Sequence, residues 1–261
     1  MSMYSDIADI IDGRKLRAAL CTVVAVSGSA PRREGAKMLV MADGTVRGTI
    51  GGGALEKQVI ADALRCLIQQ KPTLFKHDLL HRHNMCCGGS VQIFIEPIMP
   101  TDRLYIFGAG HTGKALAEMA RQCNFEVVVT DDRPEYLHGI EDKAILKMSL
   151  PFAEALQALP FDERVYVAIM TYDHAIDRDI LFFCLNKPQA YLGMIGSLRK
   201  VEVTKKMFRE AGFNDEAALS AIDMPMGLDI AAETPEEIAV SILAKLIAVR
   251  NNKHEQANKL K

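Results

Sequence analysis

A glycine-rich loop between a strand and a helix is the feature that most limits how this chain can fold. The sequence Gly-Ala-Gly-His-Thr-Gly occupies residues 108–113, between the apolar run RLYIF (103–107) and the helical run GKALAEMARQC (113–123). A second apolar run, EVVVT (126–130), follows that helix. Three glycines at this spacing allow a tight turn and let a phosphate approach the amides at the start of the helix. The pattern therefore predicts a Rossmann-type parallel sheet.

The same loop predicts where a phosphate-bearing cofactor binds. Gly108, Gly110 and Gly113, with His111 among them, are the expected cofactor-binding residues. Asp131 follows Gly110 by roughly 20 residues, the spacing at which a carboxylate hydrogen-bonds ribose hydroxyls and repels a 2′-phosphate. The loop predicts binding of NAD or another nucleotide, although such a loop can hold any phosphate.

The alternation of strands and helices extends through the second part of the chain, which predicts the domain organisation. RVYVAIM (164–170) and QAYLGMIG (189–196) read as further strands, each preceded by a helical segment. Pro97 and Pro100 interrupt regular structure. We therefore expect a small N-terminal α/β domain over residues 1–100 and a Rossmann-like, doubly wound domain over residues 101–261.

Shorter patterns predict individual elements. Apolar spacing over 4–20 suggests an opening helix broken near Gly13, and Asp43-Gly44 is typical of a hairpin turn. Thr234-Pro235-Glu236-Glu237 is a helix start with a hydroxyl N-cap. The other expected N-terminal elements are strands at 21–28 and 90–98, a hairpin over 36–50 and a helix over 54–69.

Composition excludes several classes of protein. With 261 residues and a net charge of −2, the chain lacks the basic surplus of a nucleic-acid-binding protein. No run approaches the roughly 18 apolar residues of a membrane span. The N-terminus lacks the basic start and apolar run of a signal peptide, so we expect a cytoplasmic protein.

Six cysteines are present, and two of them are adjacent. Four stand in apolar surroundings, where small buried side chains are expected. Cys86 and Cys87 precede Gly88 and Gly89 and follow two histidines, within HRHNMCCGG. The spacing of a structural zinc site is absent. Two interpretations remain: an exposed, exchangeable thiol site that a bulky ligand can approach, or a buried pair at a tight turn.

Two further segments leave alternatives open. Gly51, Gly52 and Gly53 precede a helix and form either an anion nest or a flexible strand-to-helix turn. His174, after a parallel strand, is placed to transfer protons beside a carboxylate. Asp173 or Asp177 instead caps the next helix, and this second interpretation is favoured. His111 and His174 are the candidate catalytic residues.

Taken together, these motifs resemble the XdhC/CoxI family of xanthine dehydrogenase accessory proteins. The resemblance spans residues 22–250. It rests on the stretches SGSAPRREGAKMLV, GTIGGGALE, MCCGGSVQIFIEP, IFGAGHTGKALA, VVTDDRPEY, MTYDHAIDRDIL, YLGMIGSLRK and MPMGLDIAAETPEEIAVSILA.

The resemblance implies a function in purine catabolism and assigns residues to it. It implies binding of the molybdenum cofactor, protection during sulfuration by a cysteine desulfurase, and delivery to a xanthine-dehydrogenase-type apoenzyme. The family's Cys-Gly-Gly motif falls on Cys87, which becomes the expected molybdenum ligand. Some relatives carry a cysteine after the triple glycine, where Ala54 stands here, and Cys86 is an additional thiol.

The motifs and the resemblance are compatible with three functions. The favoured one is a cofactor chaperone, in which Cys87 is a replaceable soft ligand and glycine-rich backbone holds the pterin phosphate. The second is a nucleotide-dependent oxidoreductase that uses His111 or His174 as acid or base. The third is a nucleotide-sensing scaffold protein. A homodimer is the expected oligomer, from base rates alone.

Overall fold

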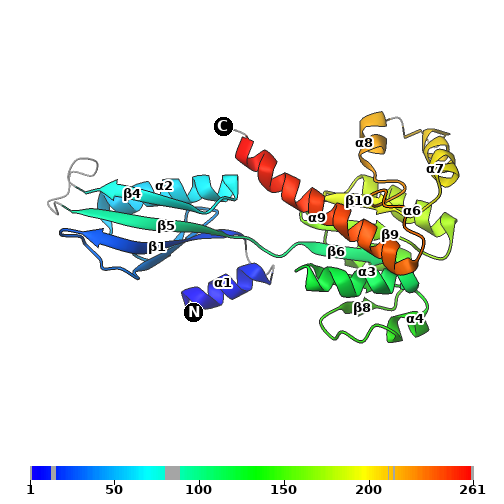
Figure 1. Ribbon diagram of the computed structural model, residues 1–261, viewed down its shortest axis with the longest axis horizontal. Helices are drawn as coiled ribbons and strands as arrows, with labels where there is room; N and C mark the ends of the chain where they lie inside the picture. The colour runs from blue at the N-terminus through cyan, green and yellow to red at the C-terminus, as the bar shows by residue number, and fades with distance from the viewer. Residues whose placement is uncertain (1, 13–15, 80–88, 211, 214, 260–261) are drawn as a thin grey trace. The chain divides into compact units, whose positions relative to one another are not determined.

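The computed structural model describes residues 2–12, 16–79, 89–210, 212–213 and 215–259. By contact density the chain divides into two compact units. The first comprises Met1–Thr101 with Asn252–Lys261, and the second comprises Asp102–Asn251. Each unit contains one five-stranded sheet (Figure 1).

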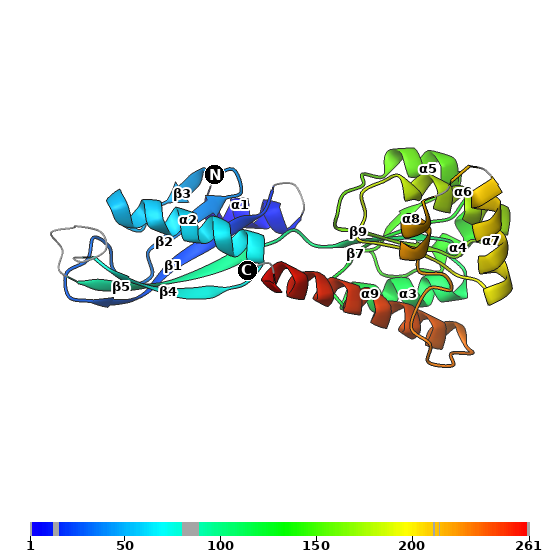
Figure 2. The ribbon, with the colours of Figure 1, turned by 90° about the horizontal axis from the view of Figure 1, so that it is seen from above.

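The N-terminal unit is an antiparallel sheet in the order β3-β2-β1-β5-β4. Its long central strands β1 and β5 pair over most of their lengths, as Figure 2 shows. Helix α2 packs on one face of the sheet, where Leu55, Val59 and Ala63 are fully buried. The elements are α1 (Met3–Ile11), β1 (Ala18–Ser27), β2 (Lys37–Met41), β3 (Val46–Gly48), α2 (Gly53–Gln69), β4 (Thr73–Asp78) and β5 (Ser90–Ile98).

The structure confirms the predicted hairpin and corrects the predicted opening helix. Thr45 donates its backbone N–H and its hydroxyl to Asp43, which fixes the turn between β2 and β3. Helix α1 ends at Ile11, whereas residues 18–20 begin β1 and pair with both β2 and β5. The prediction of helix over 4–20 was wrong at its end, because the apolar residues 18–20 serve a buried central strand and not a helix face.

The C-terminal unit is a parallel sheet in the order β10-β9-β6-β7-β8, which confirms the predicted α/β, doubly wound class. The strand order reverses beside β6, so the switch point lies between β6 and β9. The elements are β6 (Arg103–Phe107), α3 (His111–Gln122), β7 (Glu126–Thr130), α4 (Pro134–His138), β8 (Leu146–Met148), α5 (Phe152–Ala158), β9 (Val165–Ile169), α6 (His174–Leu185), β10 (Tyr191–Met194), α7 (Leu198–Glu210), α8 (Glu216–Ala221) and α9 (Pro235–Lys259).

Apolar clusters cover both faces of this sheet. Helices α3 and α9 pack on one face, and α5 and α6 pack on the other (Figures 1 and 2). Helix α9 starts with the predicted capping box: Glu237 N–H donates to the Thr234 hydroxyl at 3.2 Å, and Thr234 N–H donates to the Glu237 carboxylate at 3.0 Å. Its apolar stripe is core, because Ile242 and Leu246 are fully buried.

Candidate functional site

The loop from Gly108 to Gly113 turns directly from β6 into α3, and its glycines serve different purposes. Gly108 has a φ of +113°, and a side chain on it would overlap the carbonyl of Met170. A side chain on Gly113 would overlap the carbonyl of Gly108. By contrast, a Cβ on Gly110 would meet no atom within 4 Å. Packing therefore requires the first and last glycines, whereas Gly110 leaves open space in front of the helix.

The start of α3 is suited to an anion. Gly110 is its N-cap and makes no side-chain cap, and the first turn contains no acidic residue. The amides of the first turn have no partner within the helix, so they are available to a ligand and carry the positive end of the helix dipole. His111 is the first residue of α3 and its side chain is exposed.

Asp131, predicted to bind ribose, is fully buried behind this loop. Its carboxylate accepts a hydrogen bond from Ala109 N–H at 2.8 Å and two from the Arg133 guanidinium at 2.9 and 3.0 Å. Burial alone would raise the pKa of Asp131, but these donors outweigh it, and the pKa lies below its ordinary value. In this structure the carboxylate holds the glycine loop in place, and contact with a ribose stays a prediction.

His174 lies where α6 begins after β9, and the structure shows the capping that was favoured from the sequence. Asp173 accepts a hydrogen bond from Ala175 N–H at 2.7 Å and is the N-cap. The buried Asp177 carboxylate lies 3.3 Å from Nδ1 of His174 and accepts two hydrogen bonds from Thr171. Burial raises the pKa of Asp177 despite these contacts. Both carboxylates thus have structural partners, and one of them orients the imidazole.

The triple glycine before α2 has a different arrangement. Gly52 N–H donates to the Glu56 carboxylate at 2.8 Å, and Gly51 N–H donates to the Thr49 hydroxyl at 3.1 Å. That hydroxyl donates in turn to Glu56 at 2.7 Å. Gly53 opens the helix, and Glu56 places a negative charge in its first turn. The chain's own carboxylate therefore occupies the position that an anion nest would offer to a ligand.

Gly51 and Gly89 both lie against the segment formed by the end of β1 and the loop that follows it, at one end of the N-terminal sheet. A Cβ on Gly51 would lie 2.6 Å from the Pro31 side chain, so the triple glycine packs against the loop that follows β1. A Cβ on Gly89 would lie 2.5 Å from the carbonyl oxygen of Ser27, so the last glycine of the Cys-Gly-Gly motif packs against the same segment. The glycines at both positions permit this close approach.

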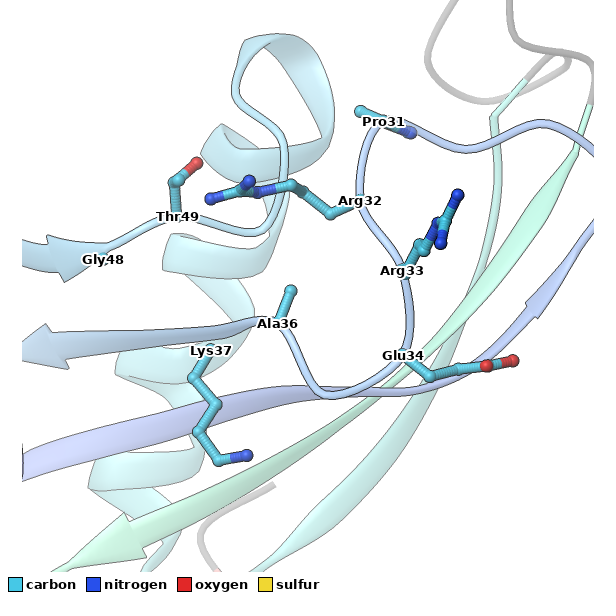
Figure 3. A pocket seen from close by; sticks show the side chains of 8 residues that line it. All are labelled: Pro31, Arg32, Arg33, Glu34, Ala36, Lys37, Gly48 and Thr49. Atoms are coloured by element: carbon cyan, nitrogen blue, oxygen red, sulfur yellow. The ribbon is translucent and has the colours of Figure 1, made fainter.

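A groove of about 610 Å³ opens beside the loop after β1 and contains the basic residues of that loop (Figure 3). Arg32 and Arg33 are exposed, and neither makes an ion pair or hydrogen bond within the described part of the chain. The Arg32 side chain extends toward Thr49. Glu34, the acidic residue of the groove, accepts a hydrogen bond from Val26 N–H at 3.1 Å.

Sequence reasoning missed these two arginines as site residues. Their signal was visible: they are adjacent, they stand between Pro31 and Gly35, and they belong to the stretch SGSAPRREGAKMLV. What the sequence did not supply was their position beside the triple glycine. Cys86, Cys87 and Gly88 lie outside the described residues.

The remaining cysteines are poor ligands. Cys21, Cys66 and Cys184 are buried, and burial raises the pKa of each thiol, to about 12 for Cys21 and Cys184. They are neutral near pH 7, whereas a soft metal binds the thiolate. Cys123 is half-buried at the C-cap of α3. Within the described ranges no three His, Cys, Asp or Glu side chains are grouped as metal ligands.

The described helices include none with the length and apolar content needed to cross a membrane.

Family models match both units of the chain. The model described as the XdhC Rossmann domain covers residues 104–246, more than half of the sequence, and the model of the XdhC and CoxI family covers residues 13–78. The chain belongs to the XdhC/CoxI family. The first XdhC match spans β6 to α9 and includes the glycine loop, and the second includes Arg32, Arg33 and the triple glycine.

Curated relatives of this XdhC-family chain come from two bacteria. It is 36% identical over 241 residues to the uncharacterized protein YqeB of Escherichia coli (strain K12), which covers 90% of the chain and 44% of YqeB. It is 35% identical over 165 residues to a probable xanthine dehydrogenase subunit of Bacillus subtilis (strain 168), which covers 62% of the chain and 47% of that protein. The chain thus spans less than half the length of these two relatives.

A more distant relative and a solved structure match nearly the whole chain. The molybdenum cofactor insertion chaperone PaoD of Escherichia coli is 21% identical over 293 residues, covering 92% of the chain and 86% of PaoD. The crystal structure of a xanthine dehydrogenase from Bacillus halodurans covers 97% of both chains with a TM-score of 0.53 and 24% identity. The second likeness shows that the fold is shared.

Proposed function

We propose that this protein serves the maturation of a xanthine-dehydrogenase-type molybdenum hydroxylase. It binds the molybdenum cofactor, protects it while a cysteine desulfurase supplies sulfur, and delivers it to the apoenzyme. The observation that carries the proposal is that Gly51 of the triple glycine and Gly89, which follows Cys87 and Gly88 in the sequence, both pack against the segment that leads into Arg32 and Arg33. The names of PaoD and of the Bacillus subtilis relative agree with this function.

The residues of this region suit the two ends of such a cofactor. Arg32 and Arg33 lie beside a groove and have no partner among the described residues, and guanidinium groups bind phosphate through paired, charge-assisted hydrogen bonds. We assign the molybdenum contact to Cys87, since a thiolate is a soft ligand and three of the four described cysteines are buried, neutral thiols. Cys86 is the alternative thiol.

A chaperone must also release its cargo. One thiolate together with arginine and backbone contacts forms a site that exchanges its ligand more readily than a closed set of four protein ligands. No chemical step is assigned to these residues: they bind, orient and shield. The groove is open to solvent beside exposed arginines, so a partner protein can reach a ligand held there.

We assign a nucleotide, NAD or a mononucleotide, to the loop at the start of α3. The support is the uncapped first turn without acidic residues and the open space at Gly110. Asp131 fixes the loop by accepting a hydrogen bond from Ala109 N–H, and Arg133 in turn donates to Asp131. A bound nucleotide in this unit would regulate cofactor transfer and would not take part in chemistry.

Co-expression with the enzymes of cofactor synthesis tests the proposal. The purified full chain is analysed for molybdenum by mass spectrometry and for pterin by fluorescence after oxidation. We expect both in the wild type, a large loss in Cys87→Ser, and a smaller loss in Cys86→Ser. Oxygen is a harder and poorer ligand than sulfur for this metal.

The arginine pair gives a matched comparison. Arg32→Ala with Arg33→Ala should lower cofactor retention, whereas Arg47→Ala, on β3 of the same sheet and outside the groove, should not. Wild-type protein without molybdenum and pterin after co-expression would refute the proposal, as would equal retention by the wild type and Cys87→Ser.

A further inference from the structure

A second basic pocket lies in the C-terminal unit, at the carboxyl ends of β9 and β10. It has a volume of about 340 Å³. Arg178 reaches it from α6, which follows β9, and Arg199 and Lys200 reach it from α7, which follows β10. Open α/β sheets bind their ligands outside the carboxyl ends of their strands.

The side chains of these three cationic residues have no partner within the described part of the chain. None of them forms an ion pair or hydrogen bond with any described residue, and the residues that line the pocket include no carboxylate. Arg199 and Lys200 stand in the first turn of α7, which has no acidic residue. Cations at a helix N-terminus oppose the helix dipole, and like charges around one pocket repel each other. Both costs are removed when an anion binds.

Thr204 and His174 add polar side chains to the pocket. Thr204 is 4% exposed and lines the pocket, and no hydrogen bond to its hydroxyl exists within the described residues. The Nδ1 of His174 lies 3.3 Å from the buried Asp177, which holds the ring in place and leaves Nε2 for a ligand.

A phosphoryl group matches this set of donors best. Two guanidinium groups, one ammonium group and the N-terminus of α7 exceed what a single carboxylate needs, and they suit a dianion with three acceptor oxygens. Met194 and Val203 add apolar surface to the same pocket. We infer that this pocket binds a small phosphate-bearing organic molecule through Arg178, Arg199, Lys200 and Thr204, with His174 as a further hydrogen-bonding group.

The inferred site is independent of the molybdenum cofactor and uses residues other than the α3 loop. A phosphate titration must nevertheless separate it from that loop, which also offers amides to an anion. Calorimetry is therefore performed on the full-length Gly110→Val variant, in which the side chain fills the space in front of α3. Inorganic phosphate is the probe, and acetate at equal ionic strength is the comparison.

We expect phosphate to bind the Gly110→Val chain and acetate to bind at least about tenfold more weakly, because the charge-assisted contacts favour the dianion. Adding Arg199→Ala should weaken phosphate binding by at least about tenfold, and Arg178→Ala, on a different helix, should do the same. Lys206→Ala removes an equal charge from α7 outside the pocket, where Lys206 pairs with Glu210, and should change the affinity less than about twofold.

The inference is overturned in two ways: if phosphate does not bind the Gly110→Val chain, or if Arg199→Ala and Lys206→Ala bind it equally well. Circular dichroism and thermal unfolding of each variant confirm that the fold is kept. Because the cofactor analysis of the wild type uses neither this probe nor these variants, the two proposals can fail separately.

Discussion

The two glycine-rich turns of this protein have similar sequences, but the amides at the start of the helix have different partners in each. Each leads from a strand into a helix, at Gly51–Gly53 before α2 and at Gly108–Gly113 before α3. At the first turn Glu56 folds back onto Gly52 N–H and Thr49. At the second turn the first helical turn has no cap and no acidic residue. A glycine run before a helix therefore offers an anion site only where no carboxylate of the chain already accepts from the amides at the helix start.

The difference extends to how each unit presents positive charge. In the N-terminal unit the cations are side chains, Arg32 and Arg33, on a loop beside the occupied turn. In the C-terminal unit the loop itself offers backbone amides, and Arg133 behind it is paired with Asp131. Side-chain cations can move with a ligand that is later released, whereas backbone amides are fixed by the fold.

The largest effect is expected from Gly113→Val. Its side chain would overlap the Gly108 carbonyl within the packed contact between α3 and β6, and relief requires backbone movement. We expect a loss of about 3 kcal/mol or more in the free energy of unfolding. Gly110→Ala is the matched control and should cost less than about 1 kcal/mol, because its Cβ meets nothing. Urea unfolding measures both, and equal losses would contradict the different functions given to these glycines.

Asp131→Asn should have the next largest effect. We expect it to lower the free energy of unfolding by about 2 to 3 kcal/mol at neutral pH, because Arg133 loses its buried charge partner. The folded-state pKa of Asp131 is lowered, so its contribution is fully present above the unfolded-state pKa of about 3.9 and is lost as the pH falls through the folded-state value. Urea unfolding at a series of pH values should show the two proteins converging in acid. A difference that stays constant down to acid pH would show that the charge is unimportant.

Gly110→Val should reduce the affinity for NAD or AMP by at least about tenfold, while leaving the fold intact. The valine side chain projects into the space that the loop leaves for a phosphate. Isothermal titration calorimetry of the wild type and the variant measures this change. If the wild type binds neither nucleotide, the loop is structural only.

The smallest effect is expected from Glu56→Ala. It should lower the free energy of unfolding by about 1 kcal/mol, because Gly52 N–H and the Thr49 hydroxyl lose their acceptor. Removal of this carboxylate should turn the triple glycine into an anion site. Sulfate should then raise the thermal unfolding temperature of Glu56→Ala more than that of Glu118→Ala, which removes an equal charge from exposed α3 surface. Equal responses would mean that Glu56 does not block an anion site.

Local patterns in the sequence were sufficient to predict most of the helices and strands. The loop at 108–113, the turn at Asp43-Gly44 and the box at Thr234 each depend on residues within one or two turns of chain, and the structure confirms them as local structure. Strand β4 was not predicted. Its buried residue His77 is polar, so the strand lacks the alternation of apolar and polar residues that identifies a half-buried strand.

Relations between distant residues could not be predicted. Gly89 meets Ser27 because β1 pairs with β5 in a register that places Ser27 opposite Ser90. Gly51 meets Pro31 because β3 pairs with β2 and β2 pairs with β1. Whether Asp131 faces a ligand or Arg133 depends on a rotamer, and composition does not determine it. The pocket at Arg178 and Arg199 required the order of β9 and β10 in the sheet.

One cross-comparison of two variants tests whether the two units hold different ligands. Full-length Cys87→Ser and Gly110→Val are each measured for molybdenum and pterin retention after co-expression and for NAD and AMP affinity by calorimetry. We expect Cys87→Ser to lose the cofactor and to keep nucleotide binding, and Gly110→Val to keep the cofactor and to lose nucleotide binding. Loss of both ligands in either variant would contradict this expectation and would show a single shared site.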